Sequence, residues 1–295
     1  MFLNKVKDTV GLNTFKKDRM KYSFDPKIFF SKPILPSNSF IILESENYSI
    51  KLAETKSELK QAQALRYSVF YKEKKAKPTF TKKIIKLDYD KIDKYADHLI
   101  VLDKKKNKKN KIVGTYRLIR GDVAKLFGGY YSSSEFNLIN ITNNYKDKHI
   151  LELGRSCVHQ DYRNGSIMNL LWKAIAKYVK LYDIKILMGC ASFSGTEPTK
   201  FSDELSYLRQ NFCLPRHLSV ESFDKNIYPV YKLNENNSKQ LRIFAKLPPL
   251  LKGYLRVGGK VSHNFYVDHN FNTIDLCVVV NTSDIDQKYR KKYLN

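Results

Sequence analysis

The stretch LELGRSCVHQDYRNGSIMNLL, residues 151–171, predicts a strand, a tight turn and a helix in succession. Residues 151–158 form a β-like apolar run, and from residue 166 apolar side chains recur every three to four positions, the period of a helix packed on one face. Backbone N–H groups at a helix N-terminus favour anions, so the turn is a candidate phosphate site. An ordinary helix start with a glycine in a tight turn is the alternative. The candidate phosphate-binding residues are Arg163, Asn164, Gly165 and Ser166.

Glu152 and Arg155 are the candidate chemical groups of the predicted strand. Alternation along a strand places Glu152 and Gly154 on one face and Leu153 and Arg155 on the other, unless a bulge at Gly154 re-aims the chain. A partly buried glutamate has a raised pKa and is suited to accept a proton from an amine, directly or through water. A structural ion pair between Glu152 and Arg155 is the alternative.

The charge of the chain indicates a negatively charged partner. Among 295 residues, 53 Lys and Arg stand against 29 Asp and Glu, which gives a net charge of +24. Nucleic acid, an anionic membrane and an acidic protein all fit this charge. Lysine greatly outnumbers arginine, however, and arginine leads in phosphate and base recognition, so compositional drift is the alternative explanation.

The cysteine and hydropathy patterns exclude several classes of protein. The four cysteines are scattered, with no CxxC pair and no His at ligand spacing, so neither a zinc site nor a disulfide framework is predicted. The apolar runs are much shorter than the roughly 20 residues that span a bilayer. No secretory apolar region follows Lys5 and Lys7. We therefore expect a cytoplasmic protein without a metal site.

The chain is expected to form one large domain at 46–285, between a variable basic extension at 1–45 and a charged tail at 286–295. Thr55 and Glu58 form a capping-box pattern that opens a helix to about residue 71, and the Lys-rich stretch that follows is predicted to be a mobile loop. The alternation of strands with a crossover helix indicates a mixed α/β sheet, with the C-terminal segment packed on the same core. The loop is expected at 72–86, the helix after the turn at 166–181, and further strands at 98–102, 112–119, 184–190 and 271–280.

Four aspartates, Asp88, Asp90, Asp93 and Asp97, lie within ten residues of this basic chain. They are candidates for neutralising a cationic substrate such as a side-chain ammonium. The alternative is that aspartate is simply a good loop and helix-cap residue.

Several long motifs, in the same order along the chain, resemble bacterial L-ornithine N-alpha-acyltransferases. The likeness covers roughly residues 49–280. The resemblance implies an acetyltransferase (GNAT)-like fold, a mixed and centrally splayed sheet flanked by helices, related to that of acyl-homoserine lactone synthases. The motifs are ALRYSVFY at 64–71, DHLIVLD at 97–103, IVGTYRLIR at 112–120, GGYYSSSEFNL at 128–138, LELGRSCVHQDYRNG at 151–165, GCASFSGTEP at 189–198, LPPLLKGYLRVGG at 247–259 and FNTIDLCVVV at 271–280.

The resemblance also implies an activity: transfer of a 3-hydroxyacyl chain from acyl carrier protein to the α-amine of L-ornithine, giving lyso-ornithine lipid. The donor is carried on 4′-phosphopantetheine, and no permanently bound cofactor is expected. In this superfamily a Q/R-x-x-G-x-G/A turn binds the coenzyme A pyrophosphate; here Tyr162 and Ile167 depart from that pattern, which suits a donor with a single phosphodiester.

By the same resemblance, Glu152 is the expected base and Arg155 its catalytic neighbour, while Arg66, Phe70, Asp90, Asp93 and Asp97 are expected at the substrate; the Asp spacing leaves Asp88 open as well. Direct attack by the amine is expected, with a backbone N–H near Cys157 or Val158 stabilising the oxyanion. Tyr207 is the expected donor of a proton to the departing thiolate, by superfamily analogy. Cys157 as a nucleophile is the alternative, but no His is placed to activate it.

The net charge then has a specific use. Acyl carrier proteins are acidic, so a basic face at 72–86 together with Lys173, Lys177 and Lys180 is expected to steer their approach. Peripheral attachment to the anionic inner leaflet is a second expectation. An acyl-homoserine lactone synthase or another N-acyl amino acid synthase is the alternative enzyme. A binding module without catalysis is the other alternative, although the chain lacks the aromatic and Gly-rich signatures of RNA-binding modules, so no nucleic acid partner is expected.

Overall fold

The computed structural model describes residues 43–106, 111–224 and 237–293. Apart from residues 43–45, the extension expected at 1–45 lies outside these ranges. No helix within them is long and apolar enough to cross a bilayer.

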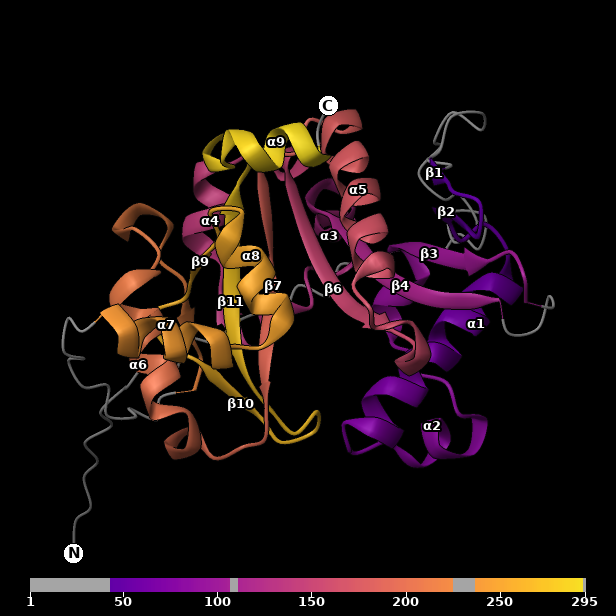
Figure 1. The fold of residues 1–295 in the computed structure, drawn as a ribbon, viewed down its shortest axis with the longest axis horizontal. Helices are drawn as coiled ribbons and strands as arrows, with labels where there is room; N and C mark the ends of the chain where they lie inside the picture. The colour runs from indigo at the N-terminus through magenta and orange to yellow at the C-terminus, as the bar shows by residue number, and fades with distance from the viewer. Residues whose placement is uncertain (1–42, 107–110, 225–236, 294–295) are drawn as a thin grey trace, which may run out of the picture. The chain divides into compact units, whose positions relative to one another are not determined.

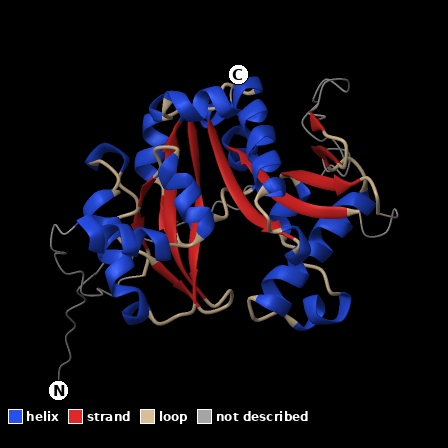
Figure 2. Ribbon diagram, in the orientation of Figure 1, coloured by secondary structure: helices blue, strands red, loops and turns tan. Residues whose placement is uncertain are grey.

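A nine-stranded sheet forms the centre of the described chain, with helices on both of its faces (Figure 2). Its strands follow the order β1-β2-β3-β4-β6-β7-β11-β10, and β9 pairs with β11. A separate two-stranded sheet pairs β5 with β8. The strands are β1 Leu43–Glu44, β2 Tyr48–Leu52, β3 Asp97–Asp103, β4 Ile112–Arg120, β5 Phe136–Asn137, β6 Ile150–Val158, β7 Ile186–Ser194, β8 Glu221–Ser222, β9 Lys260–Val261, β10 Tyr266–Asp268 and β11 Thr273–Asn281.

The sheet is mixed because β6 and β7 run parallel while its other named strand pairs are antiparallel. A parallel pair needs a crossover, and α5 (Ser166–Leu181) supplies it from the C-terminal end of β6. Ile167, Leu171 and Tyr178 of this helix are fully buried against the sheet. The predicted strand, turn and crossover helix are confirmed, and so is the mixed α/β class.

β6 and β7 separate soon after they begin. Their register pairs Ile150 with Ile186 and ends at Glu152 and Met188, and beyond this point the two strands diverge (Figure 1). Gly189 lies at the point of divergence, where a Cβ atom would be 2.2 Å from the carbonyl oxygen of Leu153. Only a glycine allows the two backbones to approach this closely. The central splay expected from the resemblance is confirmed.

Gly189→Ala is expected to destabilise the protein by about 1–3 kcal/mol, because the new methyl group must displace backbone rather than a flexible side chain. Gly154→Ala is the matched control: it lies on the facing strand, and its Cβ would meet nothing within 4 Å. Urea denaturation should separate the two variants clearly. Equal stability of both would show that the close approach at Gly189 carries no energetic weight.

The helices cover the sheet on both faces. The predicted first helix is confirmed, including its capping box: the Thr55 side chain accepts from the backbone of Glu58, and the Glu58 side chain accepts from the backbone of Thr55. This α-helix ends at Tyr67 and continues as a π-helix, Ser68–Glu73. The α-helices are α1 Lys56–Tyr67, α2 Phe80–Ile85, α3 Gly121–Phe127, α4 Ile139–Asn144, α5 Ser166–Leu181, α6 Ser202–Asn211, α7 Asn237–Lys246, α8 Pro249–Arg256 and α9 Gln287–Tyr293.

The prediction of a mobile loop at 72–86 is wrong in part, because the helix α2 lies within it. Thr79 caps this helix by accepting from the backbone of Lys82, and Lys86 ends it in a left-handed conformation with φ 56°. The Lys-rich composition suggested a loop, but Thr79 is a residue type that favours the N-terminal cap of a helix. The segment expected as a charged tail contains α9, whose Tyr289 packs against the main core.

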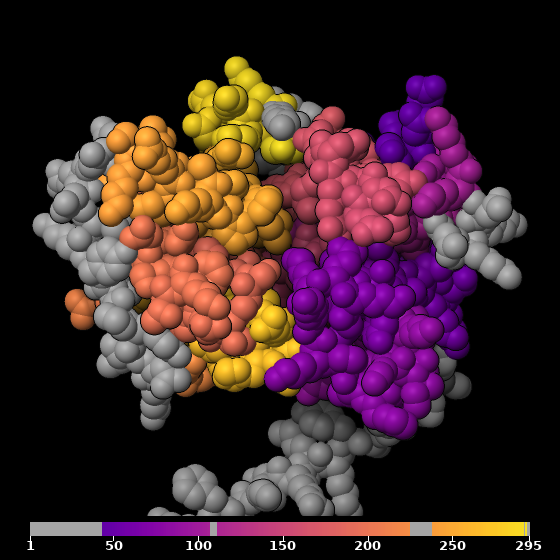
Figure 3. Space-filling view, turned by 60° about the horizontal axis from the view of Figure 1, so that its bottom comes forward, coloured from indigo at the N-terminus to yellow at the C-terminus, as the bar shows by residue number. Residues whose placement is uncertain are grey.

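The N-terminal and C-terminal parts of the described chain meet beside the splay. The backbone N–H of Lys77 donates to the carbonyl of Asn270 at 2.7 Å, and Phe70 contacts Phe271 edge-on with ring centroids 6.0 Å apart. Figure 3 shows the corresponding indigo and yellow surfaces in contact. This contact forms one wall of the site described next.

Candidate active site

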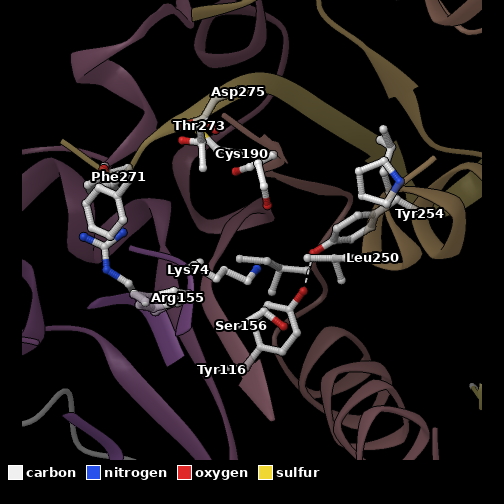
Figure 4. A pocket seen from close by; sticks show the side chains of 18 of the residues that line it. Lys74, Tyr116, Arg155, Ser156, Cys190, Leu250, Tyr254, Phe271, Thr273 and Asp275 are labelled. Atoms are coloured by element: carbon white, nitrogen blue, oxygen red, sulfur yellow. Dashed lines mark hydrogen bonds between the residues drawn. The ribbon is translucent and has the colours of Figure 1, made fainter. Parts of the chain in front are cut away.

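A cavity of about 190 Å³ occupies the splay between β6 and β7. Strands β6, β7 and β11 and helix α8 supply most of its walls, and Phe70, Lys74, Tyr131 and Phe271 complete them. Figure 4 shows Asp275, Thr273 and Cys190 on one side and the Tyr116–Tyr254 pair on the other. From the four central elements and β4, the lining residues are Tyr116, Glu152, Leu153, Gly154, Arg155, Ser156, Cys190, Ser192, Ser194, Pro249, Leu250, Leu251, Tyr254, Thr273 and Asp275, with Pro248 at the start of α8.

A β-bulge directs Arg155 to the same cavity as Glu152. Thr115 pairs with Cys157 and Arg117 with Gly154, so two residues of β6, Arg155 and Ser156, face the single residue between them on β4. Arg155 has φ 50°, the left-handed conformation that a bulge can impose. The bulge next to Gly154 is therefore present, and the side chains of β6 do not alternate strictly between the two faces of the sheet at this point.

The guanidinium of Arg155 is held on two sides. Its central carbon lies 4.4 Å from the ring centroid of Tyr131 and 4.6 Å from that of Phe271. It also pairs with Asp88 at 3.2 Å and with Asp90 at 3.2 Å. Stacking and ion pairing together fix this cation at the wall of the cavity.

Glu152 is only 1% exposed, and its two carboxylate oxygens accept three hydrogen bonds. Tyr131 N–H donates at 2.8 Å, Ser132 N–H at 2.7 Å and the Ser132 hydroxyl at 2.5 Å. Burial raises the pKa of Glu152, and these hydrogen bonds oppose that rise without cancelling it. Glu152 therefore positions the segment that carries Tyr131. It also lines the cavity, where its carboxyl group has a raised pKa.

No ion pair joins Glu152 to Arg155 within the described residues, since each has other partners. The alternative prediction, a structural ion pair between Glu152 and Arg155, is therefore wrong, because Arg155 pairs with Asp88 and Asp90 instead.

The aspartates expected at a cationic substrate instead neutralise buried arginines. Arg66, fully buried, pairs with Asp88 at 2.8 Å and with Asp93 at 2.9 Å. Arg117 pairs with Asp90 at 2.8 Å and with Asp93 at 3.0 Å. Burial would raise the pKa of Asp88 and Asp93, but the neighbouring cations outweigh burial and hold both pKa values well below their usual range.

This network lies behind Arg155 and does not line the cavity. Asp90 also caps a short 3-10 helix, accepting from the backbone of Ile92 and Asp93, as the loop-and-cap alternative anticipated. Asp97 accepts from the hydroxyl of Tyr178 at 2.8 Å. Of the expected substrate-binding residues, the structure brings only Phe70 to the cavity.

Cys157 and Val158 are buried in the hydrophobic core beside the cavity and do not line it. Burial raises the pKa of the Cys157 thiol to about 12, so it is protonated at neutral pH. This favours the expectation of direct transfer over a cysteine nucleophile. The residues of β6 that line the cavity are 152–156.

The turn at 163–166 is exposed at the N-terminus of α5, as expected for a phosphate site. Gly165 has φ 90° and begins the helix. The Asn164 side chain accepts from the backbone and the hydroxyl of Ser166, while Arg163 donates to the carbonyl of Val158 and pairs with Glu73. Asn164 and Arg163 thus already have partners within the protein.

Tyr207, expected to protonate the thiolate, lies away from the cavity. Its ring packs against Phe212 and Phe244 in the core under α7. Two other tyrosines line the cavity: the hydroxyls of Tyr116 and Tyr254 are 2.5 Å apart, and burial raises the pKa of both. This pair was missed because β4 and α8 are far apart in the sequence.

Three buried carboxylates, Glu135, Asp268 and Asp275, were also missed by sequence reasoning. One oxygen from each lies within 4.8 Å of the others, so in the described part of the chain they form a candidate cation site. Burial and repulsion by Asp275 raise the pKa of Glu135 to about 8, and burial raises that of Asp275 to about 6. Glu135 and Asp275 lie within motifs quoted above, but their residue types gave no sign that they meet.

Comparison with known proteins decides the family. An L-ornithine N(alpha)-acyltransferase of Agrobacterium fabrum (strain C58) is 36% identical over 251 residues, which cover 82% of this chain and 84% of that relative. The chain belongs to the L-ornithine N(alpha)-acyltransferase family. The enzyme of that name from Rhizobium meliloti (strain 1021) is 34% identical over 267 residues, covering 90% of each chain. A model described as acetyltransferase (GNAT) domain matches residues 65–173, and the protein is an acyltransferase.

Among solved structures, that of the AHL synthase LasI is similar, with 12% sequence identity and a TM-score of 0.44. The similarity covers 84% of this chain and 95% of that one.

Proposed function

We propose that the protein transfers a 3-hydroxyacyl chain from the 4′-phosphopantetheine of acyl carrier protein to the α-amine of L-ornithine, which yields lyso-ornithine lipid. The names of the curated relatives support ornithine as the acceptor. The observation that carries the proposal is the cavity in the splay between β6 and β7, where Glu152, Arg155 and two tyrosine hydroxyls line one space.

In the proposed reaction the pantetheine arm enters between the diverging strands with its phosphate toward the exposed turn at 163–166. The neutral α-amine attacks the thioester carbonyl, so a carbon–nitrogen bond forms and the carbon–sulfur bond then breaks. Backbone N–H groups on the cavity side of β6 stabilise the oxyanion. Holding both substrates in this space supplies the orientation that the reaction needs.

The reaction needs an acceptor for the proton of the attacking amine and a donor of a proton to the departing thiolate. Glu152, with its raised pKa, takes the amine proton through a water in the cavity, since both of its oxygens already accept hydrogen bonds. The Tyr116–Tyr254 pair replaces Tyr207 as the donor of a proton to the departing pantetheine thiolate.

The surface that binds acyl carrier protein is proposed from the positive charge of exposed lysines. Exposed lysines of the π-helix region and of α5, including Lys72, Lys177 and Lys180, give a basic face suited to an acidic carrier protein. The same excess of positive charge supports peripheral contact with an anionic inner-leaflet membrane. Turnover with the carrier-bound donor is expected to fall as salt rises, because screening weakens such steering.

A thiol-release assay tests the proposal. The purified protein is mixed with 3-hydroxyacyl carrier protein and, in turn, ornithine, lysine, glutamine or S-adenosylmethionine. Carrier thiol released with ornithine, and an N-acylornithine identified by mass spectrometry, is the expected result. Release only with another acceptor would indicate a different N-acyl amino acid synthase or a lactone synthase, and no release with any acceptor would contradict the activity.

A further inference from the structure

The three buried carboxylates beside the cavity lack the cations that such groups normally have. Glu135 is 3% exposed, Asp275 4% and Asp268 7%. No lysine, arginine or histidine in the described part of the chain forms an ion pair with any of them. Arg155 acts to lower the pKa of Glu135, but its guanidinium forms its ion pairs with Asp88 and Asp90. A buried acidic group is stable only if it binds protons or a cation.

One of these carboxylates has an unused oxygen at the cavity. Asp275 lines the cavity, and its Oδ1 atom is buried with no hydrogen-bond partner. The neighbouring Thr273 hydroxyl is also buried, and although burial raises the pKa of Asp275, hydrogen bonding by Thr273 and Ser192 acts to lower it. Figure 4 places both side chains together on the same side as Cys190. A ligand in the cavity therefore meets one unsatisfied carboxylate oxygen here, Oδ1 of Asp275.

The cluster is connected to Glu152 by a short chain of contacts. The Cys190 thiol donates to Glu135 at 3.2 Å and lies 3.4 Å from the Ser132 hydroxyl, which donates to Glu152 at 2.5 Å. An acceptor whose reacting amine lies near Glu152 thus has this cluster within the reach of its side chain.

We propose that Glu135, Asp268 and Asp275 bind the side-chain ammonium of the diamino acid acceptor. This inference rests on the proposed function and explains how the enzyme would select a diamino acid and acylate only its α-amine. An ammonium has three N–H donors, which matches three carboxylates. Held there it stays protonated and is not a nucleophile, so the α-amine alone reacts. A divalent metal ion is less well matched, because Asp268 Oδ1 already accepts from the backbone of Asn270 and Phe271 and hard ions prefer six or more oxygen ligands.

The test compares two acceptors with the same carbon chain, ornithine and norvaline, which lacks the side-chain ammonium. Wild type is expected to favour ornithine by about 100-fold or more in kcat/KM, the size of a lost charged contact. Asp275→Asn and Glu135→Gln are expected to lower kcat/KM for ornithine by a similar factor and leave norvaline almost unchanged. Asp122→Asn, a partly exposed aspartate on α3 that pairs with Arg120, is the matched control and should retain the preference.

The outcomes separate this inference from the activity itself. If wild type acylates ornithine but Asp275→Asn and Glu135→Gln, folded by circular dichroism, keep the full preference over norvaline, the inference fails and the proposed function stands. If wild type acylates neither amine, the proposed function fails as well. If EDTA abolishes turnover of both acceptors and added Ca²⁺ or Mn²⁺ restores it, the cluster is a metal site and the inference is wrong.

Discussion

Arg66→Met is expected to lower the free energy of unfolding by about 3–5 kcal/mol, the largest effect on stability among the changes considered. The side chain is fully buried and donates to Asp88 at 2.8 Å and to Asp93 at 2.9 Å and 3.0 Å. Methionine keeps much of the volume but leaves two buried carboxylates with fewer cations. Chemical denaturation at neutral pH measures the loss.

The control is Arg209→Met, an exposed arginine on α6, which should change stability by less than about 0.5 kcal/mol. Equal effects of the two substitutions would show that the network around Arg66 contributes little. Lys82 and Arg155 still pair with Asp88 in the variant, so its folding remains measurable.

The pH dependence of stability gives an independent check of the same network. Burial acts to raise the pKa of Asp88 and Asp93, but Arg66 and its neighbours lower both below their unfolded values of about 4. The stability these groups contribute is therefore fully present above about pH 4 and is lost as the pH falls toward the folded pKa values. Arg66→Met raises those pKa values, so the variant should lose less stability between pH 4 and lower pH than wild type does.

Glu152→Gln is expected to lower kcat by about 100-fold or more, the usual contribution of a general base. Glutamine cannot accept the amine proton, and its amide nitrogen cannot accept from either the Tyr131 or the Ser132 N–H. The acid-side limb of the pH profile of kcat should also disappear, since it reports the protonation of Glu152.

Ser132→Ala is the control that separates a base from a purely positioning residue. It removes the hydrogen bond from the hydroxyl to Glu152 and the contact of the hydroxyl with the Cys190 thiol, but leaves the carboxylate able to take a proton. If Glu152 is the base, Ser132→Ala keeps the acid-side limb and most of kcat. If Glu152→Gln also keeps the acid-side limb and most of kcat, Glu152 is not the base, and its role is to position the Tyr131–Ser132 backbone.

Local signals were read correctly from the sequence. The Thr55–Glu58 capping box, the strand at 151–158 and the apolar face of α5 each depend on residues within a few positions of one another. The bulge that directs Arg155 to the cavity was stated only as a condition, because it depends on the pairing of β6 with β4. Such pairings join residues about forty positions apart, and no short pattern encodes them.

The candidate site was harder to predict because its groups come from distant segments. Asp88, Asp90 and Asp93 were expected at a cationic substrate, but Arg66, Arg117 and Arg155 converge on them from α1, β4 and β6. The opposite error occurred at the cluster of Glu135, Asp268 and Asp275. Those three were not singled out as a site, because Asp268 and Asp275 meet through the pairing of β10 with β11, and Glu135 joins them from the segment before β5.

The most direct test is a crystal structure with a bisubstrate analogue in which ornithine's α-nitrogen is linked through an uncleavable acyl chain to the sulfur of phosphopantetheine. We predict that the pantetheine arm lies between β6 and β7 with the linked carbon in the cavity beside Glu152 and the Tyr116–Tyr254 pair. Density for the analogue elsewhere on the protein, with this cavity filled only by water, would contradict the site and the mechanism derived from it.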